Sequence, residues 1–264
     1  MLTWVARFDH SWAPVESEET AAAIADIVQR ECFSACSRVS YARSGSFGRP
    51  GRNGGYKKKN AAIVREYILD ARNESVHLDN GRQGELTASM RFATGAVRRE
   101  GIPLFSYLAM PLSDDVTALE EAACDLAGAL RVHVGAIAVF PVYRWAEKFG
   151  YSSDLMDDRA REMGLSERRH QEWNAWSNHR LARQSEIAGP EWGLFLSSGH
   201  LAKLPASVIR ASGAFAEVRE LEGDRAFLRL TDDPRDALAP DYEARLDKAR
   251  DALRPILADP AWLA

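Results

Sequence analysis

The sequence predicts an α+β fold, in which a mixed or antiparallel sheet is flanked by helices and the last helix packs on the sheet. Strand-like and helix-like segments are mixed without strict βαβ alternation. Residues 215–230 are typical of a hairpin, because alternating apolar residues flank the turn Glu222-Gly223-Asp224. Residues 236–257 have the spacing of an amphipathic helix, with one leucine stripe made of Leu238, Leu246, Leu253 and Leu257.

The first part of the chain predicts one strand, one helix and one loop. Residues 3–8 alternate weakly, as a strand does. A helix is expected from about residue 14 to residue 36, with a core face made of Ala21, Ile24, Ala25, Ile27 and Val28. Residues 44–60 are rich in glycine, serine and positive charge, which predicts a mobile or extended loop. Residues 62–70 fit a helix and a strand equally well.

The middle of the chain predicts several strands around one helix. Strands are expected at 76–78 and 86–92, on either side of Asp79-Asn80-Gly81, and at 104–112. Asp114 and Asp115 precede a helix over 116–130, since acidic residues favour a helix N-terminus. Residues 132–143 read as a strand buried on both faces, and about 145–188 as a polar helical insertion.

Size and composition predict a single soluble domain over residues 1–264. The net charge of −4 and the pI near 5.9 do not favour direct nucleic-acid binding, for which a basic surface is typical. No apolar segment reaches the length of a signal sequence or a membrane span, so we expect a cytoplasmic protein without membrane contact. The odd count of three cysteines argues against a disulfide framework, and Cys32 and Cys36 are expected on one helix face as buried thiols.

The chain has no motif that predicts catalysis, a metal or a cofactor. Its six histidines form no HExxH, HxH or HxxxH pair. Ser198 lacks the GxSxG context of a nucleophile and is expected to cap a helix. We therefore expect no enzyme, no cofactor and no metal site. The alternatives are a hydrolase-type site assembled from dispersed residues such as Asp9, His133 or His200, and a scaffold subunit of a larger assembly.

Residues 154–176 are the predicted contact surface for a protein partner. Steering charges are expected at Asp154, Asp157, Asp158 and Glu162, and aromatic or arginine anchors at Arg169, Trp173 and Trp176. The alternatives are a solvated helix with internal salt bridges and two core tryptophans. The basic residues of the 44–60 loop, including Arg52, Lys57, Lys58 and Lys59, suit either phosphate, an acidic protein surface or simple hydration.

From about residue 61 onward the order of signals resembles a known family. The strand VHVGAIAVFPVY is followed by a polar helical section, EWGLFLSSGHLAKL, the hairpin FAEVRELEGDRAFLRL and a TDDP exit into the last helix. This order, with Trp192, Gly193, Leu196, Gly223 and Pro234, resembles the immunity proteins of bacterial type VI secretion and polymorphic-toxin systems, in the immunity protein 52 class and its relatives.

The resemblance implies a non-catalytic cytoplasmic protein that binds and neutralises a cognate toxin. In this class the toxin is often a nuclease of the restriction-endonuclease-like type. A nuclease needs a basic cleft for phosphate, and an acidic inhibitor surface is suited to occupy or flank it.

Overall fold

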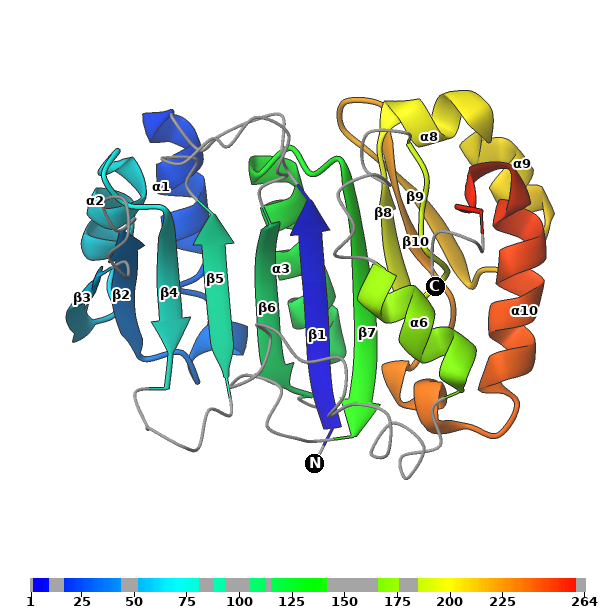
Figure 1. The fold of residues 1–264 in the computed structure, drawn as a ribbon, viewed down its shortest axis with the longest axis horizontal. Helices are drawn as coiled ribbons and strands as arrows, with labels where there is room; N and C mark the ends of the chain where they lie inside the picture. The colour runs from blue at the N-terminus through cyan, green and yellow to red at the C-terminus, as the bar shows by residue number, and fades with distance from the viewer. Residues whose placement is uncertain are drawn as a thin grey trace.

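The computed structural model describes residues 2–9, 17–43, 52–80, 88–93, 105–112, 115–141, 166–175 and 185–259. Within these ranges ten strands form one sheet in the order β3-β2-β4-β5-β6-β1-β7-β8-β10-β9, and every neighbouring pair is antiparallel (Figure 1). Its strands are β1 (Leu2–Asp9), β2 (Arg38–Arg43), β3 (Arg52–Lys58), β4 (Ser75–Asp79), β5 (Ser89–Ala93), β6 (Phe105–Pro111), β7 (Val134–Pro141), β8 (Gly193–Leu196), β9 (Glu217–Leu221) and β10 (Arg225–Arg229). This sheet, with its flanking helices, confirms the predicted α+β class.

Side chains of successive strand residues alternate between the two faces of the sheet. On β1, Trp4, Ala6 and Phe8 belong to one hydrophobic cluster, whereas Val5 belongs to another. On β1 the residues of the first cluster point to the side away from the viewer in Figure 1, which we call the rear face and where α1, α2 and α3 lie, and those of the second cluster point to the front face.

Different helices cover the two faces. The rear face packs against α1 (Glu18–Ile27), α2 (Ala61–Leu69) and α3 (Val116–Ala129). The front face of β7, β8 and β10 packs against α6 (Glu167–Ala175), α8 (Ser198–Lys203), α9 (Ala206–Ala211) and the C-terminal part of α10 (Tyr242–Leu253). None of the described helices lies over the front face of β2, β4, β5 and β6 in Figure 1.

Several predicted elements are confirmed with their local causes. The helix predicted at 116–130 is α3, whose first turn is capped by the Asp115 carboxylate accepting from the Ala118 N–H at 3.0 Å. The predicted hairpin is β9–β10, and Gly223 in its turn has φ 74°, a conformation that favours glycine. Trp192 is fully buried, and its indole N–H donates to the Thr231 carbonyl at 3.1 Å.

The loop predicted for residues 44–60 is wrong over Arg52–Lys58, which form the edge strand β3. The strand has no apolar alternation, and pairing with β2 supplies its order. A β-bulge interrupts the register between Val39 and Tyr41, and Gly55 takes φ 71° there. The Gly55 carbonyl accepts a hydrogen bond of 2.6 Å from the Tyr67 hydroxyl on α2, the helix form of the ambiguous segment at 62–70. Residues 44–51 lie outside the described residues.

Three helix predictions are corrected in their extent. The helix expected at 14–36 is the shorter α1, with Ser17 as its N-cap, and a 3₁₀ turn at Glu31–Phe33 follows. Cys32 and Cys36 therefore do not share one helix face, and only Cys36 is fully buried. The cap of α8 is Ser197, one residue before the expected Ser198.

The helix expected at 236–257 is divided into three parts. A 3₁₀ helix (Pro234–Leu238) precedes α10, and another (Arg254–Ile256) follows it. Leu238 consequently lies outside the buried stripe and is 46% exposed, whereas Leu246 and Leu253 are fully buried.

Candidate functional site

The predicted contact segment is described only in its last part, helix α6. The acidic residues Asp154, Asp157, Asp158 and Glu162 lie outside the described residues, as do Trp176 and the side chain of Trp173. Helix α6 begins directly after Ser166, whose hydroxyl accepts a hydrogen bond of 3.1 Å from the Arg169 N–H. Of the predicted site residues, Arg169 therefore has a described side chain.

The Arg169 side chain does not lie on the surface, where the sequence placed it. It is 2% exposed and forms an ion pair with Glu191, which is 1% exposed. The guanidinium donates from Nε to both Glu191 oxygens at 3.2 Å and from Nη2 to Oε2 at 2.8 Å. It also stacks 4.9 Å from the ring centre of Tyr242 on α10. In this structure Arg169 holds α6 against the segment that leads into β8, so it offers a partner almost no surface.

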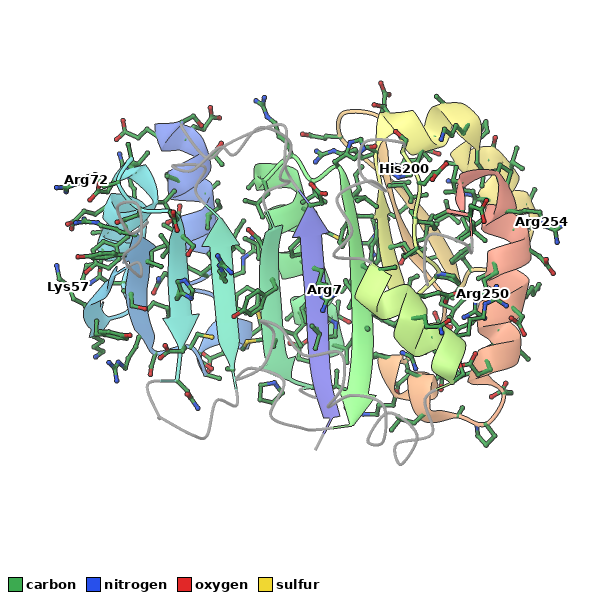
Figure 2. All side chains as sticks on the ribbon, viewed as in Figure 1. Arg7, Lys57, Arg72, His200, Arg250 and Arg254 are labelled. Carbon is green, nitrogen blue, oxygen red and sulfur yellow. The ribbon has the colours of Figure 1, made fainter. Side chains whose placement is uncertain are left out.

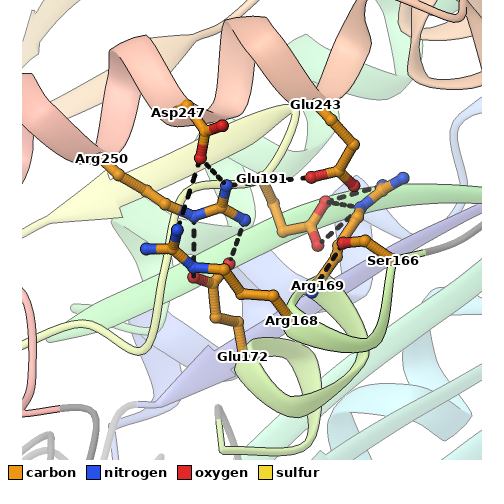
Figure 3. A network of polar contacts seen from close by, with 8 residues as sticks. All are labelled: Ser166, Arg168, Arg169, Glu172, Glu191, Glu243, Asp247 and Arg250. Carbon is orange, nitrogen blue, oxygen red and sulfur yellow. Dashed lines mark hydrogen bonds and ion pairs between the residues drawn. The ribbon is translucent and has the colours of Figure 1, made fainter.

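A second buried ion pair ties α6 to α10 (Figure 3). Arg250 donates to the two oxygens of Glu172 at 2.8 and 2.7 Å, and both side chains are less than 5% exposed. Toward the solvent, Asp247 accepts from Arg250 at 2.8 Å and from Arg168 at 3.4 Å. These paired charges fix the position of α6, since the cost of leaving one buried charge unpaired is large.

The charge of Glu191 affects the pKa values of two arginines, Arg169 and Arg7. Burial alone lowers the pKa of Arg169, but the charge of Glu191 and their hydrogen bonds raise it above its usual value, so the guanidinium is charged. Burial also lowers the pKa of Arg7 on β1 to about 10, and Glu191 opposes that shift. Glu191 therefore stabilises arginine charge contributed by both α6 and β1.

The three residues named for a dispersed hydrolase site meet at one end of β1, β7 and β8. The backbone N–H of His133 donates to the Asp9 carbonyl at 2.7 Å, and the rings of His133 and His200 lie 5.4 Å apart. The Ser197 hydroxyl lies 2.9 Å from Nδ1 of His200. The chain therefore brings the segments that carry Ser197, His200 and Asp9 into one neighbourhood, in which the contact with Asp9 is made between backbone atoms.

The geometry of this Ser-His-Asp neighbourhood is that of a helix cap. His200 is fully buried and Ser197 is 7% exposed, which leaves a substrate little access. Nδ1 of His200 also accepts from the Ser197 backbone N–H at 3.3 Å, which completes a capping box at the start of α8. Burial, and next the neighbouring His133, lower the pKa of His200 to about 3, although a backbone hydrogen bond at Glu186 opposes the shift. A base with this pKa is poorly matched to proton transfer at neutral pH.

Glu120 and Glu191 are buried charges that the sequence analysis missed. Glu120 lies on α3 and is 3% exposed. Its carboxylate forms ion pairs with Arg219 on β9 at 2.6 Å and with Arg229 on β10 at 3.3 Å. Its signal was a glutamate at a core-facing position of an otherwise apolar helix face. The corresponding signal for Glu191 was its position directly before Trp192 and the buried β8 run.

The other groups of chemical interest among the described residues are the cysteine thiols and one pocket. Among them, no group of three or more His, Cys, Asp or Glu side chains is placed to hold a metal ion. Burial raises the pKa of the Cys36 and Cys124 thiols to about 12, which opposes thiolate formation. A pocket of about 510 Å³ opens beside Cys32, between Arg30, Glu31 and Asp115. Within the described part of the chain, no helix is long and apolar enough to cross a bilayer.

Comparison with known proteins identifies the fold and leaves the family open. No family model matches the chain, and no curated protein matches it. Among solved structures, the Pseudomonas aeruginosa T6SS protein PA0821 is similar, with a TM-score of 0.60 and 14% sequence identity. The match covers 97% of this chain and 73% of that one. At this identity the similarity is one of fold.

Proposed function

We propose that this chain is a non-catalytic immunity protein of a type VI secretion system, which neutralises a cognate toxin by direct protein–protein contact. The observation that carries the proposal is the fold shared with a T6SS protein across 97% of this chain. The sequence resemblance to the immunity protein 52 class points to the same kind of system. Fold similarity alone does not assign function, so the proposal rests on both observations together.

The polar clusters of the described residues support a binding role. The ion pairs of Arg169 and Arg250 are buried and satisfied within the fold. The Ser197–His200 pair caps a helix. A rigid surface is what an inhibitor needs, because a preorganised partner loses little conformational entropy on binding.

The partner in this proposal is a nuclease toxin, and the protein acts in the cytoplasm, where such a toxin meets its substrate. The contact surface is the segment 154–176. Helix α6, which ends this segment, is fixed by two buried ion pairs. Asp154, Asp157, Asp158 and Glu162 provide the steering charges toward the basic cleft of the nuclease, with Trp173 and Trp176 as anchors.

The test begins with the product of the neighbouring reading frame. We expect that product to co-purify with this chain, and to kill a bacterial host unless this chain is co-expressed. The absence of both binding and protection would overturn the proposal.

The contact segment is tested by the double variant Asp157→Lys/Asp158→Lys. We expect its affinity for the toxin to fall at least tenfold at low salt, because charge reversal replaces attraction by repulsion. The control Asp232→Lys/Asp251→Lys changes the same number of charges at sites that are 87% and 72% exposed. Equal affinities of the two variants would remove the segment from consideration.

A hydrolase is the second candidate, because Asp9, His133 and His200 converge in space. Its test is hydrolysis of activated esters and phosphodiesters by the purified protein. Turnover that disappears in the variant His133→Gln would establish this candidate in place of the first.

A further inference from the structure

The front face of β2, β4, β5, β6 and β1 carries a polar row, although its rear face is core. Rear-face residues such as Leu78, Met90 and Leu108 are fully buried. The residues between them point forward, and the register aligns His77, Arg91, Tyr107 and Arg7 side by side on four successive strands. Adjacent strands lie roughly 4.8 Å apart, so this row spans roughly 14 Å. Figure 2 labels Arg7 on β1 at one end of it.

The outer part of the same face adds two basic side chains. Arg38 on β2 is paired in register with Lys58 on β3 and with Asp79 on β4. The Arg38 guanidinium lies 5.2 Å from the ring centre of Tyr56, which is 57% exposed. Arg7 at the end of the row is shielded, because burial lowers its pKa and Glu191 lies near it. We therefore give the name open sheet face to the surface made of Arg38, Lys58, His77, Arg91 and Tyr107.

The open sheet face is basic on a chain whose net charge is −4. It carries three arginine or lysine residues, and the acidic residue aligned with it is Asp79. Arg91 and Lys58 are exposed, and neither forms an ion pair with a residue that the structure describes. A concentration of positive charge against the sign of the whole molecule favours a partner of opposite charge.

The row places two basic side chains opposite each other. Arg91 lies directly opposite His77, a position in which two like charges would destabilise the sheet. Burial, and next the charge of Arg91, lower the pKa of His77 to about 4, so this ring is neutral at pH 7. The basic character at neutral pH therefore belongs to Arg38, Arg91 and Lys58.

We propose that the open sheet face binds an acidic surface of the protein partner. The inference deepens the proposed function, on which it rests, by adding a second contact of opposite charge to the segment 154–176. Tyr56 and Tyr107 suit a protein interface, where tyrosine is enriched. Single-stranded nucleic acid is the other polyanion that a basic face attracts, and the experiment below includes it as the competing outcome.

The first experiment uses fluorescein-labelled poly-L-glutamate of about 20 residues as the acidic probe, followed by fluorescence anisotropy at low salt. The variant Arg91→Glu/Lys58→Glu is expected to bind the probe at least tenfold more weakly than the parent protein. The control Arg245→Glu/Arg254→Glu makes the same charge change at two exposed sites, one on α10 and one directly after it, and is expected to stay within about twofold.

Three results of this experiment would overturn the inference: no binding of poly-L-glutamate to the parent protein, equal losses in the two variants, or tighter binding of single-stranded DNA of equal charge. Thermal unfolding of each variant checks that it is folded. If the Glu variant unfolds, the milder Arg91→Gln/Lys58→Gln takes its place, with an expected loss of at least threefold.

A second experiment separates this inference from the proposed function. The same variants are titrated with the product of the neighbouring reading frame. If the parent protein binds that product and Arg91→Glu/Lys58→Glu binds it equally well, the open sheet face is not its contact, whereas the immunity function stands. If the parent protein binds poly-L-glutamate through this face but does not bind the product of the neighbouring reading frame, the immunity function is contradicted and the binding of acidic partners by this face is not.

Discussion

Glu191 is the single side chain on which the placement of α6 depends most. Its carboxylate is 1% exposed and accepts three hydrogen bonds from Arg169. A buried ion pair is weak evidence for net stability, because both charges lose their hydration. The removal of one partner, however, leaves the other charge buried without compensation.

The variant Glu191→Gln is therefore expected to lower the free energy of unfolding by about 3–5 kcal/mol. Urea denaturation measures the change. The double variant Arg169→Met/Glu191→Leu removes both charges of the pair and is expected to recover part of the loss, because Arg7 still lacks Glu191. Asp251→Asn, at an exposed pair with Arg254, is the control and is expected to cost less than about 1 kcal/mol. A loss below about 1 kcal/mol for Glu191→Gln would contradict the structural role of the pair.

His200 makes stability depend on pH. Its pKa is lowered from 6.5 to about 3 in the folded protein, so the unfolded chain binds this proton more readily. Stability from the neutral ring is complete above about pH 6.5, and falls by about 1.4 kcal/mol per pH unit as the pH drops toward 3.

The variant His200→Gln isolates this effect, because glutamine at the third helical position keeps a capping box. Between pH 7 and pH 5 the parent protein is expected to lose about 2 kcal/mol more than the variant, measured as free energies of unfolding in urea. Equal losses would mean that His200 is accessible to protons in the folded state.

At the scale of elements, β3 shows why local sequence was insufficient. Its sequence RNGGYKK has neither alternation nor strand propensity, so the sequence predicts a loop there. The strand exists because β2 pairs with it and because Tyr41 and Tyr67 pack edge to face at 5.1 Å under its bulge. Those contacts come from segments far apart in the chain.

Gly55 and Gly128 form a matched test of this bulge. A Cβ at Gly55 would meet the ring of Tyr41 and the hydroxyl of Tyr67, and its φ of 71° is strained for other residues. Gly55→Ala is expected to cost about 2 kcal/mol or more of unfolding free energy. Gly128 lies in α3 with nothing within 4 Å of the added atom, so Gly128→Ala is expected to stabilise by about 0.5–1 kcal/mol. Thermal unfolding measures both, and opposite signs are the expected outcome.

At the scale of the whole molecule, the sequence predicts the class of the fold and misses the chemistry of its interior. Strong periodic patterns correctly located α3, β6, β7 and the β9–β10 hairpin. The strand order and the division of helices between two faces depend on long-range pairing, which no single segment encodes. The sequence analysis missed the burial of Glu120, Arg169 and Glu191. Charged residues are expected on the surface, and only the structure shows the partners that allow these three to be buried.

The position of β1 in the middle of the sheet bears on how the chain reaches this structure during synthesis. β1 pairs with β6 and β7, so its partners are synthesised much later. Roughly a hundred residues separate Val5 from Ala109 on β6, and more separate it from Ala138 on β7. A nascent chain that stops before β7 exposes an apolar edge of β1 to other chains in the cell. Chaperones that bind exposed strand edges are therefore expected to be most important after β1 has left the ribosome and before β7 has, while residues 9 to 134 are synthesised.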